Sequence, residues 1–335
     1  MTIVRVLKDW KWPDLMRQTP GHTGIWDGIQ FTEQPMDAYD YVVVLNRVPQ
    51  DTTLRCPPAS IWAVIQEPPV PEYRWLAKGF DRFGRVYTPD TTFEGPRFIH
   101  SHGALPWHVN RDYDYLKACT PPEKKRTLSW VTSSSKGRAG HRLRMEFLDR
   151  LQQQVQFDVW GRGFQPIDDK WDGLAPYRYG LAIENHSAPY YWTEKIVDCF
   201  LAWTMPIYYG CTNIYDYFPK EAMIQVDITK PDEAIGIIKD TIQSDLYLRR
   251  RDAIAEARRL ILDRYQFFPF MTALIEEREN KKPTEDKQTI FLPRLPFLYP
   301  YPELNNKPQG SLKILSGSRT SKHGISPVVA LAFQL

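Results

Sequence analysis

The chain has 335 residues, of which 42% are hydrophobic and 25% charged, and its 43 Lys and Arg against 40 Asp and Glu leave a net charge of +3. This is the composition of a globular protein of about two domains, without the broad basic surface of a nucleic-acid-binding protein. No apolar run approaches the roughly 20 residues of a membrane span, and the first residues lack a signal-peptide pattern, so we expect a cytoplasmic protein without a transmembrane segment or a nucleic-acid partner.

The first 120 residues alternate short strand patterns with turns and short helical stretches. The runs at 41–45 and 61–65 are continuously apolar, which is typical of strands buried on both faces of a parallel sheet. We expect further strands at 3–7 and 85–87, and a helix at 70–78. This alternation indicates an open α/β sheet.

A linker with two prolines and a charge run covers residues 119–126, and the strand–helix pattern restarts after it. The sequence predicts a second series of strands, at 127–131, 157–160, 179–183, 205–209 and 223–226. It predicts helices between and after them, at 141–153, 193–203, 231–243 and 246–265. The second half is therefore also an α/β unit.

The pattern ends near residue 280, where a charged stretch leads into a segment too rich in proline for a helix or a central strand. We expect an α/β domain at 1–120, a second at 127–275, and a Pro/aromatic-rich tail at 280–335. The tail either packs its aromatic side chains on the body or serves as a partner- or substrate-binding arm. Two such Rossmann-like domains with a cleft between them bind ligands outside the carboxyl ends of their strands.

The four cysteines are widely spaced and form no C-x-x-C or Cys/His cluster at zinc-site spacing. We therefore expect reduced structural thiols and no structural metal site. The residues are Cys56, Cys119, Cys199 and Cys211.

A loop of small residues at 132–140 follows one predicted strand and precedes a helix. Free backbone N–H groups and the positive end of the helix can hold an anion there. The loop matches neither a P-loop nor G-x-G-x-x-G, so by itself it fits a solvated turn equally well. Basic side chains add charge to it: Lys136, Arg138, His141, Arg142 and Arg144.

A sharper signal lies where a strand ends in Glu184-Asn185 and a helix begins near Thr193. Thr193 is a good N-cap, so Glu194 and Lys195 fall in the first helical turn, beside unpaired N–H groups. Glu194 there can accept hydrogen bonds from ribose hydroxyls, or it can simply interact favourably with the helix dipole. A lysine at a helix start is unfavourable for that dipole but can meet phosphate oxygens. The pair therefore suits a nucleoside diphosphate.

These segments resemble the donor-binding signature of the family 10 glycosyltransferases, the α1,3/α1,4-fucosyltransferases. The matching blocks occur in order: Tyr177-Arg-Tyr179, Leu181-Ala-Ile-Glu-Asn185, Tyr191-Trp-Thr-Glu-Lys195 and Pro206-Ile-Tyr-Tyr-Gly210. Ile183 stands where the family usually has Phe. The resemblance covers about residues 127–265. It is nearer to the bacterial members, since no membrane anchor or stem precedes the domain.

The resemblance implies a GT-B-like fold, with an N-terminal acceptor-binding domain and a C-terminal domain that binds the nucleotide-sugar donor. It implies that Arg144 and Lys195 hold the phosphates of GDP. It also implies that Glu194 and Asn185 contact ribose or fucose, and that Tyr191 lines the same pocket. Independently, the guanidinium of Arg144, near a helix start, suits a bidentate grip on phosphate oxygens.

The first half carries one segment that resembles the family, Ile61-Trp-Ala-Val-Ile-Gln-Glu-Pro-Pro69. The resemblance implies that Glu67 is the general base. A carboxylate at the end of a buried strand, followed by two prolines, can face a cleft and take a proton from an acceptor hydroxyl. Without the resemblance Glu67 would be a surface residue before a proline turn.

Asp112 and Asp114 form a D-x-D, a metal–nucleotide motif of another glycosyltransferase fold, but no strand pattern precedes them. We expect solvated loop residues. His100, His102 and His108 could indicate a metal or a sugar surface, and we expect satisfied loop histidines, with an acceptor-side role as the next interpretation. Helix dipoles and basic residues can neutralise a leaving diphosphate, so we expect no required cofactor and at most a stimulatory divalent cation.

The sequence thus predicts an inverting glycosyltransferase that moves L-fucose from GDP-fucose to a hydroxyl of an oligosaccharide acceptor. The family's habit is transfer to the 3-hydroxyl of N-acetylglucosamine or glucose. One alternative keeps the fold and changes the nucleotide sugar. The other is a non-catalytic glycan- or nucleotide-binding protein, against which the presence of Glu67, Arg144 and Lys195 together speaks.

Overall fold

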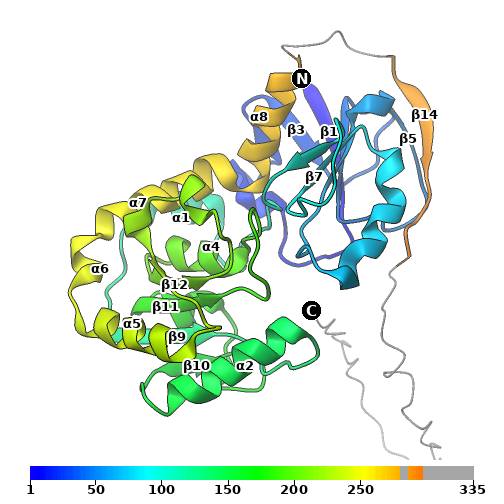
Figure 1. Ribbon diagram of the computed structural model, residues 1–335. Coiled ribbons are helices and arrows are strands. Elements are labelled where there is room, and N and C mark those ends of the chain that lie inside the picture. Colours follow the sequence, from blue (N-terminus) through cyan, green and yellow to red (C-terminus); the bar gives the residue numbers. More distant parts are fainter. Residues whose placement is uncertain (280–285, 297–335) are drawn as a thin grey trace, which may run out of the picture. The chain divides into compact units, whose positions relative to one another are not determined.

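Seven strands from the first 100 residues form one sheet, in the order β2-β3-β1-β4-β6-β7-β8. The structure is a computed structural model that describes residues 1–279 and 286–296 (Figure 1). Neighbouring strands run parallel except for the antiparallel pair β2 and β3. The strands are β1 (Thr2–Leu7), β2 (Ile25–Trp26), β3 (Ile29–Thr32), β4 (Tyr41–Leu45), β6 (Ile61–Val64), β7 (Arg85–Thr88) and β8 (Phe98–His100).

The four strands predicted for this half are confirmed, and every residue of β4 and β6 is buried, as their apolar runs indicated. Strands β2, β3 and β8 were not predicted; they have only two to four residues each, too short for the alternation in β3 to stand out. The helix expected at 70–78 is present as a longer 3₁₀ helix, η4 (Pro71–Arg82). Shorter 3₁₀ turns are η1 (Met16–Gln18), η2 (Pro20–His22) and η3 (Pro58–Ser60).

The second half forms a five-stranded sheet in the order β10-β9-β11-β12-β13, with every pair parallel. All five predicted strands are confirmed: β9 (Arg126–Val131), β10 (Asp158–Trp160), β11 (Tyr177–Ile183), β12 (Met205–Tyr209) and β13 (Ile224–Gln225). Together with the first sheet they confirm the expected GT-B-like architecture of two Rossmann-like sheets.

Helices α2 (Ala139–Gln152), α3 (Lys170–Leu174) and α4 (Glu194–Leu201) connect the strands of the second sheet. Because β10 and β11 lie on opposite sides of β9 and crossovers are right-handed, α2 covers one face while α3 and α4 cover the other. α3 and α4 accordingly contact each other, and α2 contacts α5 (Pro231–Gln243). The helices predicted at 141–153, 193–203 and 231–243 are therefore present.

The helical stretch predicted at 246–265 is confirmed in its extent but is not one continuous helix. It is divided at Arg250 into α6 (Leu246–Arg249) and α7 (Arg251–Leu260) and ends in a π turn (Ile261–Tyr265), after which the unpredicted α8 (Phe267–Glu279) follows. α8 lies against the first sheet, where the rings of Phe267 and Phe268 pack on Phe31 and that of Phe270 on Tyr87 (Figure 1). These aromatic contacts explain why the helical stretch turns away from the second sheet.

The predicted linker follows the short helix α1 (Tyr113–Ala118) and has no regular structure before β9. The side chain of Lys124 nevertheless holds the linker in place. The ammonium donates to Ala175 O at 2.7 Å, Ala202 O at 2.9 Å and Thr204 Oγ1 at 3.1 Å, so the linker is held to the ends of α3 and α4. The four thiols are free, as expected.

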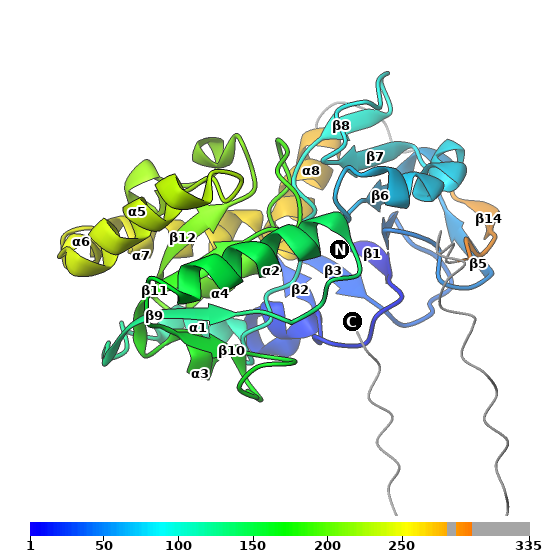
Figure 2. The same cartoon turned by 60° about the horizontal axis from the view of Figure 1, so that its bottom comes forward.

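Part of the predicted tail forms β14 (Gln288–Leu292), which pairs antiparallel with β5 (Thr52–Cys56) in a two-stranded sheet (Figure 2). A strand near prolines is compatible with such an edge position. Met1–Leu298 form one compact unit. The rest of the tail, at 280–285 and 297–335, lies outside the described residues, and the domain boundaries stay a prediction.

Candidate active site

The start of α4 is anchored to the end of β11. Thr193 is the N-cap, as predicted, and its hydroxyl accepts from the backbone N–H of Lys195. The buried carboxylate of Glu184, the residue after β11, accepts from Thr193 N at 2.8 Å and from Thr193 Oγ1 at 2.8 Å. A Cβ at Gly210 would lie 2.4 Å from Glu184 Cγ, so only glycine leaves room for this carboxylate.

Lys195 lies between two carboxylates. Its Nζ is 3.1 Å from Glu184 Oε2 and 3.6 Å from Glu194 Oε1, and it donates to Thr193 Oγ1 at 3.0 Å. The sequence offered no dipole reason for a lysine at a helix start. The structure explains the lysine in another way, because the two carboxylates compensate its charge. The contact of Lys195 with a diphosphate stays a prediction.

Glu194, the first residue of α4, faces Lys170 and His108 in addition to Lys195. Lys170 Nζ is 3.4 Å from Glu194 Oε1, and His108 Nδ1 lies 3.9 Å from the same oxygen. Burial opposes ionisation of this carboxyl, but Lys195 and Lys170 outweigh it and hold its pKa well below its usual value. Glu194 is therefore an anion that can accept hydrogen bonds.

The structure brings together Arg144 and Asn185, two of the predicted donor residues. The guanidinium of the buried Arg144, in α2, donates to the Asn185 side-chain oxygen and to Thr132 Oγ1 at 2.6 Å. Within the described part of the chain its Nε has no partner. Gly140 permits the approach, since a Cβ there would lie 1.7 Å from Asn185 O.

Tyr191 is buried immediately before α4. Burial, and then the nearby Glu184 and Glu67, raise the pKa of its hydroxyl well above the usual value, so the phenol stays protonated. Tyr190 before it adopts φ 63°, and its N–H donates to Asn213 Oδ1 at 2.7 Å. This backbone conformation, unusual for a tyrosine, fixes the direction in which Tyr191 enters the site.

Glu67 follows β6 and is half-buried. Burial raises its pKa to about 7; Asp9 acts in the same direction, and Arg138 and Lys195 act against it. The residues that influence this pKa include Lys195 of α4, so the predicted base shares an electrostatic environment with the predicted donor residues. Its catalytic role stays a prediction.

A second contact links the same two regions. Arg138, the residue before α2, donates to the hydroxyl of Tyr73 in η4, and its guanidinium lies 4.8 Å from the centre of that ring. The basic loop at 132–138 is therefore held to the segment that follows Glu67. It is not a freely solvated turn.

Sequence reasoning missed Asp198 and Lys170 behind Glu194, and named His108 without linking it to Glu194. Asp198 accepts from the backbone N–H groups of His108 at 2.7 Å and Val109 at 3.2 Å, and from Lys170 Nζ at 3.0 Å. Asp198 lies four residues after Glu194 on the same helix face, a spacing that could have indicated it. Nothing in the local sequence pointed to Lys170 or to the backbone of His108.

Asp114 is exposed and Asp112 half-buried, so both reach solvent as expected, but they belong to the start of α1 and not to an irregular loop. Asp112 is the N-cap of α1 and accepts from Tyr115 N at 2.7 Å, and Asp114 accepts from Gly21 N at 2.8 Å. His102 is buried with its ring stacked on Trp192 at 4.5 Å. No group of three or more His, Cys, Asp or Glu in the described residues could hold a metal ion.

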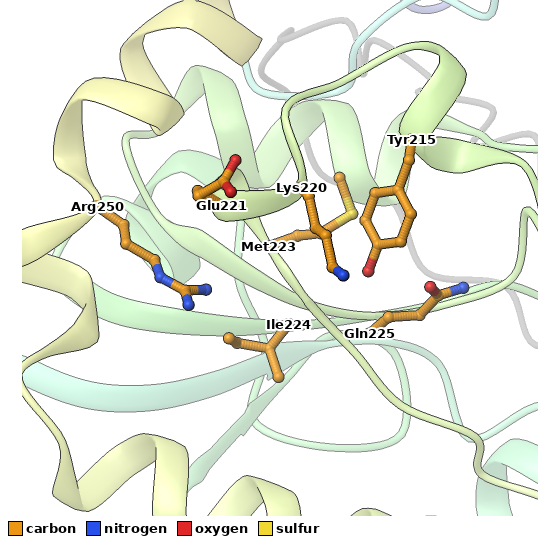
Figure 3. Close-up of a pocket in the computed structure, with 7 residues that line it drawn as sticks. All are labelled: Tyr215, Lys220, Glu221, Met223, Ile224, Gln225 and Arg250. Atoms are coloured by element: carbon orange, nitrogen blue, oxygen red, sulfur yellow. The ribbon is translucent and has the colours of Figure 1, made fainter.

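A surface pocket of about 320 Å³ lies apart from these residues, at the β13 edge of the second sheet (Figure 3). Lys220 lies beside the ring of Tyr215 in it, at 5.8 Å, and Arg250 approaches from the opposite side. None of the predicted site residues lines it. Its lining residues are Tyr215, Lys220, Glu221, Met223, Ile224, Gln225 and Arg250.

Comparison with known proteins supports the resemblance. The family model described as "Glycosyltransferase family 10 (fucosyltransferase) C-term" matches residues 121–244, which include every predicted donor residue but not Glu67. The human 3-galactosyl-N-acetylglucosaminide 4-alpha-L-fucosyltransferase FUT3 is 30% identical over 173 residues, or 50% of this chain and 45% of the relative. The alpha-(1,3)-fucosyltransferase FucT of Helicobacter pylori is 36% identical over 74 residues, or 22% and 16%.

The matches to the first curated relatives span less than half of their length, 44% and 45%. A crystal structure of an alpha1,3-fucosyltransferase with GDP-fucose aligns with 79% of this chain and 92% of its own, at 17% identity and a TM-score of 0.46. In the described residues, no helix is both long and apolar enough to cross a membrane.

Proposed function

Because residues 121–244 belong to glycosyltransferase family 10, we propose that this chain is an inverting fucosyltransferase. It transfers L-fucose from GDP-fucose to a hydroxyl of a glycan. The observation that carries the proposal is the meeting of Arg144 and Asn185, at the start of α2 and the end of β11, with the Glu184–Lys195 pair at the start of α4.

The donor's diphosphate is held by Arg144 and Lys195. Both are cations close to a helix start, where backbone N–H groups and the helix dipole also favour an anion. The guanidinium of Arg144 is oriented by Asn185 and Thr132 before any ligand arrives. Such preorganised charge stabilises the leaving diphosphate as its bond to fucose breaks. This is also why we propose that a divalent cation is at most stimulatory.

Glu194 and Asn185 contact the hydroxyls of ribose or fucose. Lys195 and Lys170 keep the Glu194 carboxylate ionised, so it acts only as a hydrogen-bond acceptor. Tyr191, with its hydroxyl protonated, lines the same pocket.

Glu67 is the general base. It takes the proton from the acceptor hydroxyl as that oxygen attacks the anomeric carbon from the face opposite GDP. The new C–O bond forms, the bond to the diphosphate breaks, and the configuration inverts. A pKa of about 7 suits this task, since a base with a pKa near the working pH is both available and strong enough.

The acceptor is an oligosaccharide, and the hydroxyl is the 3-OH of an N-acetylglucosamine or glucose unit. Both cited relatives are named for galactosyl-N-acetylglucosaminide acceptors, which supports an oligosaccharide acceptor. The relative named as a 3-alpha-L-fucosyltransferase supports the 3-OH, whereas the other is named for the 4-position.

The test is transfer itself. The protein is incubated with GDP-fucose and a library of oligosaccharides, and mass spectrometry detects the addition of a deoxyhexose. In parallel, GDP-, UDP- and TDP-sugars are compared by their effect on the melting temperature, because a ligand that binds only the native state raises it. Stabilisation by UDP- or TDP-sugars but not by GDP-fucose would contradict the proposed donor. GDP binding without any transfer would favour a non-catalytic binding protein.

A further inference from the structure

Trp12 is the only exposed residue among the eleven tryptophans, all of which lie in the described part of the chain. Its side chain is 51% exposed, yet it is held from one side. The ring of His108 lies 5.0 Å from the indole, and the guanidinium of Arg17 lies 5.9 Å from it. Single exposed hydrophobic side chains are common on protein surfaces, so exposure alone does not single out Trp12. Its position does, because the indole rests on His108, which reaches the proposed site.

The loop that carries Trp12 lies at the same sheet edge as Glu67. It follows β1, whereas Glu67 follows β6, and β1, β4 and β6 are parallel neighbours. The carboxyl ends of parallel strands share one edge. Asp9, in the same loop as Trp12, is close enough to raise the pKa of Glu67.

A second series of contacts joins Trp12 to the proposed donor residues. His108, which touches Trp12, has its Nδ1 3.9 Å from Glu194 Oε1. Glu194 in turn lies 3.6 Å from Lys195 Nζ, and Lys195 influences Glu67. Contacts thus run from Trp12 through His108 and Glu194 to Lys195, and the charge of Lys195 is felt at Glu67. Trp12 therefore lies at the edge of the region that holds both the proposed base and the proposed donor residues.

We propose that Trp12 is the platform on which a sugar ring of the acceptor stacks, with His108 supporting the indole from behind. This inference rests on the proposed function. The flat indole matches the apolar C–H face of a pyranose, while the hydroxyls of the sugar stay available to water. Trp12 comes from the sheet that carries the base, whereas the diphosphate-binding cations lie on α2 and α4, so the occupant is the acceptor and not the donor.

The chemistry of His108 is consistent with this role. Burial, followed by the neighbouring Lys170, lowers its pKa to about 4, against the opposing charges of Glu194 and Asp198. The ring is therefore neutral near pH 7 and brings no charge against the indole or a neutral sugar. The hydrogen bond that the His108 backbone N–H donates to the Asp198 carboxylate fixes the position of His108.

The experiment compares Trp12→Ala and Trp12→Phe with Tyr215→Ala. The control removes a ring of similar exposure, 40%, from the pocket at β13. Initial rates are measured against N-acetyllactosamine at saturating GDP-fucose, and against GDP-fucose at saturating N-acetyllactosamine. GDP affinity is measured by calorimetry. We expect Trp12→Ala to raise the acceptor KM about tenfold, as for loss of one aromatic stacking contact. Trp12→Phe should raise it less.

The donor KM and GDP affinity should stay at the parent values in all three variants, and Tyr215→Ala should match the parent throughout. A donor KM that rises while the acceptor KM does not, or a Trp12→Ala variant with the parent acceptor KM, would overturn the platform while the fucosyltransferase function stands. Saturation-transfer NMR of N-acetyllactosamine on the GDP-loaded protein supplies a readout independent of turnover. Glycan signals that are equally strong with the parent and Trp12→Ala would also overturn it. Failure of the parent to bind GDP at all would instead refute the proposed function.

Discussion

Glu67 is held as a partly buried carboxyl, so its ionisation should cost the native state stability. The raised pKa, from 4.5 to about 7, means that the folded protein keeps a proton there which the unfolded chain has lost. Stability should therefore fall as the pH rises from about 4.5 to about 7. Since one pKa unit corresponds to about 1.4 kcal/mol, the full cost above pH 7 is about 3 kcal/mol.

Glu67→Gln removes this cost, because an amide of nearly the same shape cannot ionise. At pH 8 the variant should be more stable than the parent by up to about 3 kcal/mol, or on the order of 5 °C in melting temperature for a chain of this size. At pH 4.5 the difference should largely vanish. The measurement is thermal unfolding of both proteins at the two pH values and constant ionic strength. Glu146→Gln, on the exposed face of α2, is the matched control and should show the same difference at both pH values.

The same variant tests the catalytic role. Turnover of Glu67→Gln should fall by roughly a hundredfold or more, the usual contribution of a positioned base, with GDP affinity nearly unchanged. For the parent, kcat/KM should rise with pH and level off above about 7. An equal melting difference at pH 4.5 and pH 8 would refute the burial argument. Fucose transfer by the variant at near the parent rate would place the base elsewhere.

Three other outcomes follow from the site. Lys195→Ala should weaken GDP binding about ten- to a hundredfold, because it leaves the carboxylates of Glu184 and Glu194 facing the diphosphate. Lys195→Arg should keep most of the affinity. Calorimetry that shows parent affinity for Lys195→Ala would contradict the assignment. A chelator should not abolish transfer, because Arg144, Lys195 and two helix starts supply the positive charge; complete loss that added metal restores would refute this. Truncation at about residue 280 should leave GDP affinity intact while lowering the melting temperature, since among the described residues it removes the pairing of β14 with β5, the buried side chain of Leu292 and the ion pair of Lys287 with Asp40. A folded truncated protein that no longer binds GDP would make the tail part of the donor site.

Local sequence patterns were sufficient for the elements that carry the site. The continuous apolar runs at 41–45 and 61–65 gave the correct strands because such residues are stable only when buried on both faces of a sheet. Thr193 was recognisable as an N-cap because capping depends on a residue and its near neighbours. The continuation of this helical stretch into α8 was not predicted, for the converse reason. α8 packs its aromatic side chains on the distant first sheet.

By itself, the sequence determined the two series of strands and the family 10 signature, because both are recorded in residues close together in the chain. Only the tertiary structure decided the charge environment of the site. The partners of Glu194 include Lys170 and His108, 24 and 86 residues before it. The charge of Lys195 influences the pKa of Glu67, from which it is separated by more than a hundred residues in the chain. A pKa depends on burial and on every charge nearby, whatever its position in the chain. For the same reason the exposed indole of Trp12 became a candidate binding surface only once folding had placed His108 behind it.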